Sequence, residues 1–110
     1  MEGNVNLYNQ QTATLEEEVI ELLSSQGNVR IERILSMGQA SPEGFWYDQE
    51  EMEWVCVLEG QGVLQWEDGS KRVLERGDWI MIPPHVRHRV LSTSVTPPCI
   101  WLAFFWKYEK

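Results

Sequence analysis

The pattern of hydrophobic and polar positions changes once along the chain, near Asn28. Before it, the segment TLEEEVIELLSSQG (14–27) places its apolar residues at helical spacing: Leu15, Val19, Leu22 and Leu23. Thr14 and Glu17 fit a capping box, acidic residues fill the first turn, and Gly27 suits a helix end. We therefore predict one short amphipathic helix, preceded by an N-terminal strand that starts near residue 4.

After Asn28, short apolar segments alternate with turn residues. Gly-x-Gly, Asp-Gly and Gly-Asp turns separate the segments between Glu53 and Trp79, and Pro97-Pro98 marks a later break. This pattern is typical of an antiparallel sandwich or barrel. No repeat, low-complexity tract or linker divides the chain. We expect a single, mainly β domain over residues 1–110, with a strand and helix at about 4–27 and the barrel at about 28–107.

Two predicted strands, EWVCVL and CIWLAFFW, are apolar on both faces. In the first, alternation divides the side chains into two sets: Glu53, Val55 and Val57 on one face, and Trp54, Cys56 and Leu58 on the other. A strand without a polar face is covered on both sides. The barrel interior supplies one cover, and the helix, the opposite sheet or another subunit supplies the second. We expect a homodimer.

Composition narrows the class of protein. The 110 residues carry a formal charge of −8, which disfavours binding to nucleic acids and anionic membranes. Cys56 and Cys99 lack a CxxC spacing, and we expect two buried, reduced thiols. The start, MEGNVNLYNQ, is too polar for a signal peptide, and CIWLAFFW is far shorter than the roughly 20 residues that span a bilayer. We expect a cytoplasmic protein.

Both histidines of the chain lie in one segment, which runs from Gly77 to Ser92 as G-DWIMI-P-P-H-VR-H-RVL-S. Its Gly77, Pro83 and His88 are in register with the second motif of the cupin superfamily, in which His85 here replaces a glycine and Ser92 an asparagine. The segment Glu53-WVCVLE-Gly60 fits the end of the first cupin motif. On these residues the chain resembles a compact single-domain cupin, which implies a jelly-roll barrel over about residues 28–106.

The resemblance also implies a metal site, which this sequence supplies only in part. Metal-binding cupins carry His-x-His three or four residues before the glutamate. Those positions are Tyr47 and Gln49 in one register, and Trp46 and Asp48 in the other. Of the usual three histidines and one glutamate, only Glu53 and His88 are kept.

Strand alternation predicts which of these side chains meet. Tyr47 and Gln49 share the parity of Glu53, whereas Asp48 points away unless a bulge re-aims it. His85 and His88 face opposite sides unless the chain turns between them. We favour a metal-free pocket in which the histidines are a remnant. The alternative is a reduced site for Zn, Fe, Mn or Ni, built from a subset of these residues: His88, Glu53, Gln49, Asp48 and His85.

Three functions follow from these alternatives, because a fold alone does not define an activity. The first is binding of a sugar-like or small carboxylic molecule by a set of pocket residues: Tyr47, Gln49, Glu53, His88 and Trp46. The second is an enzyme, either a metal-dependent isomerase, dioxygenase or decarboxylase at His88 and Glu53, or a metal-free acid–base isomerase that uses His88. The third is a structural or regulatory dimer whose barrel is filled by aromatic side chains.

Overall fold

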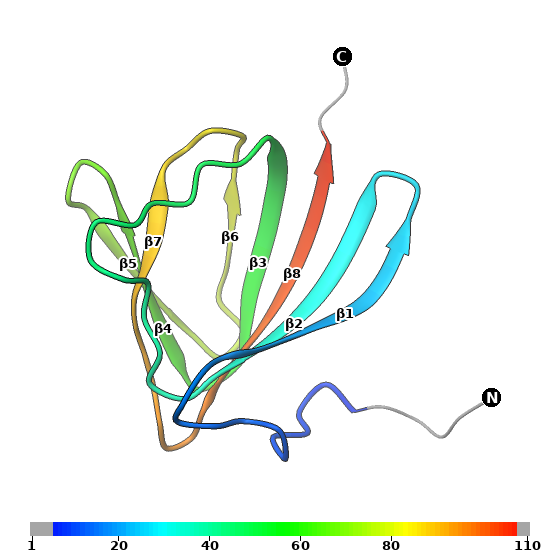
Figure 1. The fold of residues 1–110 in the computed structure, drawn as a ribbon, viewed down its shortest axis with the longest axis vertical. Helices are drawn as coiled ribbons and strands as arrows, with labels where there is room; N and C mark the ends of the chain where they lie inside the picture. Colours follow the sequence, from blue (N-terminus) through cyan, green and yellow to red (C-terminus); the bar gives the residue numbers. More distant parts are fainter. Residues whose placement is uncertain (1–5, 108–110) are drawn as a thin grey trace.

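A computed structural model describes residues 6–107, which form eight antiparallel strands in two facing sheets (Figure 1). The strands are β1 (Val19–Gln26), β2 (Val29–Ser36), β3 (Glu51–Glu59), β4 (Gln61–Trp66), β5 (Lys71–Glu75), β6 (Trp79–Ile82), β7 (His88–Thr93) and β8 (Cys99–Lys107). The larger sheet has the order β1-β2-β8-β3-β6 and the smaller one β5-β4-β7. No helix able to cross a membrane occurs in residues 6–107.

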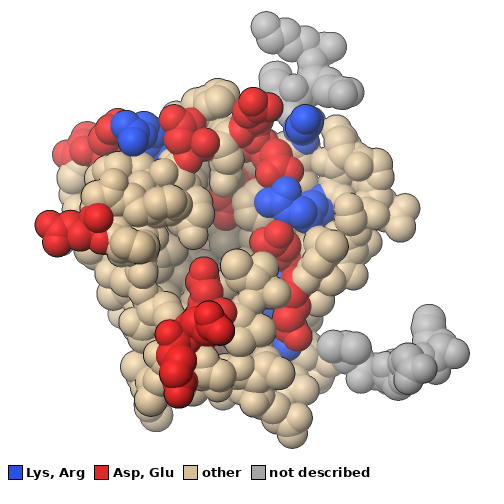
Figure 2. Space-filling view, in the orientation of Figure 1, with Lys and Arg blue, Asp and Glu red and all other residues tan. Residues whose placement is uncertain are grey.

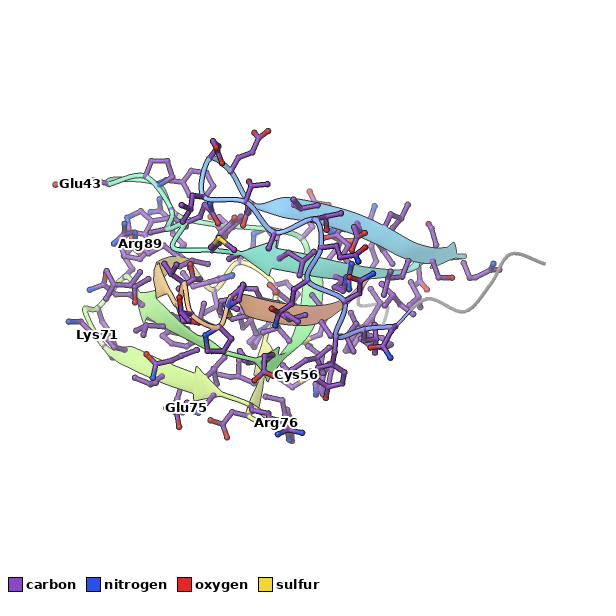
Figure 3. The ribbon with its side chains drawn as sticks, turned by 90° about the horizontal axis from the view of Figure 1, so that it is seen from below. Glu43, Cys56, Lys71, Glu75, Arg76 and Arg89 are labelled. Atoms are coloured by element: carbon purple, nitrogen blue, oxygen red, sulfur yellow. The ribbon has the colours of Figure 1, made fainter. Side chains whose placement is uncertain are left out.

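The core fills the space between the two sheets, which lie close together at the lower end of Figure 1 and spread apart towards the upper end. Figure 3 shows the sheets as two layers with side chains between them. The buried cluster comes from both layers and consists of Val55, Val57, Leu64, Leu74, Ile82, Cys99, Trp101, Ala103 and Phe105. The division of β3 into two faces is confirmed, because Val55 and Val57 join this cluster whereas Trp54 contacts Trp79 and Phe104 on the outer face.

The helix predicted over residues 14–27 is wrong. The amide of Glu17 does donate to the hydroxyl of Thr14 (3.3 Å), as in a capping box. The chain then extends, and Val19–Gln26 pairs with β2 as the edge strand β1. Pairing with β2 satisfies the backbone groups that a helix would have satisfied locally, so long-range structure overrides the local pattern. Residues 6–9 of the predicted N-terminal strand form a turn, and residues 4–5 lie outside the described range.

The segment before β1 is attached to the outer face of the larger sheet through Arg33 on β2. The Arg33 residue is 3% exposed. Its guanidinium donates to the carbonyls of Asn6 (3.2 Å), Leu7 (3.2 Å) and Asn9 (2.9 Å), and it pairs with Glu21 of β1. These contacts hold the segment against β2.

Trp101 packs directly against the backbone of β4. A Cβ atom added to Gly62 would lie 2.3 Å from two carbon atoms of the Trp101 ring, so only glycine fits opposite the indole. Trp101 is 4% exposed and fully enclosed by the cluster described above. The Trp101 ring therefore lies at the boundary between the packed core and the internal cavity that is described below.

This contact yields a test of the packing. Gly62→Ala should destabilise the protein by roughly 1–3 kcal/mol, because the new methyl group overlaps the Trp101 ring and forces it to shift from its packed position. Chemical unfolding monitored by tryptophan fluorescence measures the change. Arg72→Ala, at an exposed position on the adjacent strand β5, should leave the stability nearly unchanged. Equal stability of Gly62→Ala and the wild type would contradict this account of the core.

Candidate functional site

A cavity of about 180 Å³ lies between the sheets, beyond Trp101. Figure 2 shows acidic side chains around the hollowed centre of this face of the molecule. The lining has an apolar part, formed by Ile20, Ile34, Val55, Leu64, Ile82, Val90, Trp101 and Phe105. Its polar part consists of Glu18, Arg30, Glu32, Tyr47, Gln49, Glu53 and His88. The barrel is therefore not filled by its aromatic side chains.

Glu53 and His88 face each other across this cavity from different sheets. Glu53 lies on β3 and His88 begins β7, and Glu53 Oε1 lies 3.6 Å from His88 Nε2. The two side chains are 12% and 5% exposed, respectively. A carboxylate this far from water requires polar partners, and the imidazole is one of them. The two strands thus bring together the pair that the cupin resemblance implied.

Neighbouring groups fix the orientation of both side chains. His88 Nδ1 lies 2.9 Å from the carbonyl oxygen of Val86 and donates to it, which leaves Nε2 towards Glu53. Tyr47 stacks on the imidazole at 5.4 Å between ring centroids, and its backbone forms a two-way bridge to that of His88. Gln49 Nε2 donates to Glu53 Oε1 at 2.9 Å. The site is therefore held in place before any ligand binds.

The surroundings shift the pKa values of two pocket residues. Burial by itself lowers the pKa of His88, but the nearby Glu53 carboxylate and the hydrogen bond to the Val86 carbonyl outweigh burial and raise it above 6.5. Burial raises the pKa of the Tyr47 phenol, and the carboxylates of Glu18, Glu53 and Glu32 add to this effect. Both shifts favour the form of the side chain that carries the proton, relative to the free side chain, and both of these forms can donate hydrogen bonds.

The rim of the cavity carries charged residues that sequence reasoning missed. Arg30 on β2 donates from Nε to Glu32 (2.8 Å) and from Nη1 to both carboxylate oxygens of Glu51 (2.8 and 2.6 Å). Its guanidinium carbon lies 4.2 Å from the centroid of Phe105. Glu18 is also at the rim, and burial, with a smaller contribution from Glu32, raises its pKa despite a hydrogen bond to Ser36. Alternation in RIERI, residues 30–34, was the signal that could have placed Arg30 and Glu32 inside.

Three residues considered for the site from sequence lie elsewhere. Asp48 and His85 form a pair outside the cavity, with Asp48 Oδ1 2.8 Å from His85 Nδ1 and side chains 45% and 64% exposed. His85 has a positive φ of 63°, so the chain does turn before His88, but it turns the imidazole away from the pocket. Trp46 does not contribute to the cavity lining. The structure brings together Tyr47, Gln49, Glu53 and His88.

This donor set does not fit a tightly held metal ion. Within residues 6–107, no group of three His, Cys, Asp or Glu side chains is arranged to hold one. Gln49, a candidate third ligand, would offer only its neutral amide oxygen, and its amide N–H donates to Glu53. His88 and Glu53 alone are one or two protein ligands short of a typical site.

Cys99 is buried among apolar residues, where burial raises the pKa of its thiol to about 12, and Cys56 is also free and buried.

Comparisons with known proteins agree with this fold. Residues 34–105 match the model of the cupin domain family. The structure of a protein from Ralstonia eutropha JMP134, provisionally assigned as a mannose-6-phosphate isomerase, has 38% identity and a TM-score of 0.89 and covers 97% of this chain and 100% of its own. The chain belongs to the cupin superfamily.

Two further solved structures share the fold at lower identity. An RmlC-like cupin from Desulfovibrio desulfuricans is 20% identical, with a TM-score of 0.74 and 96% of each chain covered. KdgF from Halomonas sp. is 18% identical, with a TM-score of 0.68 and coverage of 84% of this chain and 82% of its own. No curated protein matches the chain.

The interaction between Glu53 and His88 predicts a pH-dependent effect. In Glu53→Gln the pKa of His88 should fall, because the carboxylate that favours the imidazolium is gone while burial remains. The folded-state pKa of wild-type His88 lies above its ordinary value of 6.5. The contribution of protonated His88 to the free energy of unfolding is therefore complete below pH 6.5, and it is lost as the pH rises through the folded-state pKa.

An NMR titration of the His88 ring protons measures this shift. Glu51→Gln is the matched control, because Glu51 pairs with Arg30 at the rim and should leave the titration of His88 nearly unchanged. A His88 pKa that is the same in the wild type and in Glu53→Gln would show that the pair does not interact.

Proposed function

We propose that this cupin binds a small, uncharged, hydroxylated molecule of the sugar-like class in its barrel cavity. The observation that supports the proposal is the convergence of Glu53, His88 and Gln49 in a cavity whose lining also has a large apolar part. Glu53 accepts hydrogen bonds from hydroxyl groups, and His88 and Tyr47 donate them. A few placed polar groups on an apolar lining are the usual design of a small-molecule site.

The charge of the cavity favours an uncharged ligand over an anion. Glu18, Glu32 and Glu53 line it, and within residues 6–107 Arg30 is the only arginine or lysine in the lining. The charge of Arg30 is already compensated by Glu32 and Glu51. A phosphate or carboxylate would enter a negative, partly desolvated space, where repulsion is stronger than in water. A phosphorylated sugar, as the provisional assignment of the Ralstonia protein implies for that protein, is therefore disfavoured here.

The size of the cavity limits the ligand further. Pockets for drug-sized molecules measure roughly 300–1,000 Å³, and this cavity measures about 180 Å³. A ligand of monosaccharide size or smaller matches that volume. The faces of Phe105 and Trp101 offer flat apolar surface for the C–H groups of such a molecule, while its hydroxyl groups meet the polar wall.

Binding of neutral and charged probes tests the proposal. Titration of the full chain with D-mannose, D-glucose and mannose 6-phosphate, followed by two-dimensional NMR, should give saturable shifts at Gln49, Glu53 and His88 for a neutral sugar and weaker binding of the phosphate. Glu53→Gln should weaken binding of that sugar by about tenfold, as expected for the loss of one charge-assisted hydrogen bond. Lys71→Ala, on the outer side of the smaller sheet, should have no effect.

Three results would reject the proposal. The first is tighter binding of mannose 6-phosphate than of either neutral sugar. The second is the absence of a saturable shift at every pocket residue. The third is binding of the neutral sugar by Glu53→Gln with the same affinity as by the wild type. Stoichiometric metal in protein purified without added metal, together with metal-dependent turnover, would favour the alternative of a metal-dependent cupin enzyme.

A further inference from the structure

The loop between β2 and β3, residues 37–50, carries two of the four pocket residues but contains no strand. Its only regular pairing is one isolated bridge to the start of β7, which is made by Tyr47 (Figure 1). In the loop end, residues 47–49, the side chains alternate: Tyr47 and Gln49 line the cavity, and Asp48 between them is exposed to solvent. The geometry of the pocket therefore depends on the contacts that hold the loop end.

His85 holds the loop end from outside the barrel through two contacts. Its backbone N–H donates to the carbonyl oxygen of Gln49 (2.8 Å), and its Nδ1 lies 2.8 Å from Asp48 Oδ1. Arg87 also lies near Asp48, but it pairs with Glu67 at 2.7 Å and is 4.0 Å from the Asp48 carboxylate. His85 is therefore the nearer partner of Asp48, and it contacts two successive residues of the loop end.

The backbone of His85 adopts a conformation that favours glycine. Its φ is 63°, in the left-handed region where a side chain is disfavoured. The side chain is 64% exposed, so burial in the core does not compensate for this conformation. Within residues 6–107 the imidazole makes one hydrogen bond, and that bond is to Asp48. The His85 ring therefore makes its contact with the loop end, whereas glycine would form its own turn more easily.

We propose that Asp48 and His85 are positioning residues, which act on the pocket from outside the barrel. Asp48 is bonded to Tyr47 on one side and to Gln49 on the other, so a movement of Asp48 displaces both pocket side chains. Tyr47 then loses its stacking on the buried imidazole, and Gln49 loses its hydrogen bond to Glu53. The expected effect on ligand affinity rests on the proposed function, whereas the effect on the geometry of the pocket does not.

The effect of this pair is local. An exposed ion pair contributes little to the free energy of unfolding of a whole domain. The loop end, however, is held to β7 and to the turn before it by few hydrogen bonds: the two of the Tyr47 bridge, one from the His85 amide, and the side-chain pair. Loss of one of these contacts raises the population of the opened loop end without unfolding the sheets. Local opening is therefore the quantity to measure.

Amide hydrogen exchange of the full chain without added ligand, measured by NMR, tests the proposal. Asp48→Ala and His85→Gly should each speed exchange of the Tyr47 amide by about fivefold, as expected for the loss of an exposed ion pair. The ring protons of His88 should shift, because the Tyr47 ring stacks on that imidazole. The amide of Ala103 in β8 should exchange as in the wild type. Glycine adopts the backbone conformation of His85 readily, so His85→Gly removes the ring and keeps the turn.

Two further variants test whether the two residues act as a pair. The double variant Asp48→Ala/His85→Gly should exchange no faster than either single variant, because the first substitution already removes the contact. His85→Asn should restore part of the protection, because asparagine tolerates a positive φ and its side-chain amide can donate to Asp48. Glu75→Gln is the matched control and should leave exchange of Tyr47 unchanged. Glu75 is likewise paired on the surface, with Gln61 at 3.0 Å, and it projects outwards from the smaller sheet (Figure 3).

Unchanged exchange of Tyr47 in both single variants would overturn the proposal. Equally faster exchange at Ala103 would also overturn it, because that result indicates a loss of global stability. Additive effects in the double variant would show that Asp48 and His85 act separately, which contradicts the proposal as well.

Ligand binding is the second measurement. Asp48→Ala and His85→Gly should bind the neutral sugar about threefold more weakly than the wild type. Affinities equal to that of the wild type would show that the loop end does not position the site. If the wild type binds no sugar, the proposed function fails, and the exchange rates alone decide whether Asp48 and His85 position the loop end.

Discussion

The register of β3 between β8 and β6 is the constraint on which the rest of the structure depends. In this register Glu53 lies opposite Phe105 and Ile82 and faces the cavity, whereas Trp54 lies opposite Phe104 and Met81 and faces outwards. A shift by one residue would exchange the two faces. It would place a carboxylate on the apolar outer side of the larger sheet and an indole in the cavity. One pairing therefore sets both the composition of the cavity lining and that of the outer side of the sheet.

The polar wall of the cavity is stable because each of its charges has a partner. The Glu53 carboxylate accepts from Gln49 and faces His88, and the His88 ring in turn donates to a backbone carbonyl. A glutamine and a tyrosine stand at the positions where one register of the family motif has histidines. Hydrogen bonds from the Gln49 amide to Glu53 and from the His88 ring to the Val86 carbonyl orient these side chains.

Local sequence patterns predicted the features that depend on alternation and short spacing. The parity of Tyr47, Gln49 and Glu53, and the outward direction of Asp48, follow from the two-residue period of extended chain. The conformation of residues 14–27 could not be predicted in this way, because it depends on the pairing of one strand with another. Residues 14–27 have a helical pattern, but β2, which follows after a turn at Gly27 and Asn28, offers an edge that pairs Val19 with Leu35 and Gln26 with Val29. The same pairing carries Glu18 to the cavity rim, where a helix would have left it in solvent.

The hydrogen bonds of Arg33 have a consequence for how the sequence can vary. The guanidinium contacts the carbonyl oxygens of Asn6, Leu7 and Asn9, and every amino acid has that group. Replacement of these side chains leaves the acceptors in place, whereas removal or insertion of a single residue would move them off the fork of the guanidinium. The side chains of residues 6–9 can therefore vary without loss of these hydrogen bonds, whereas the number of residues in the segment cannot change.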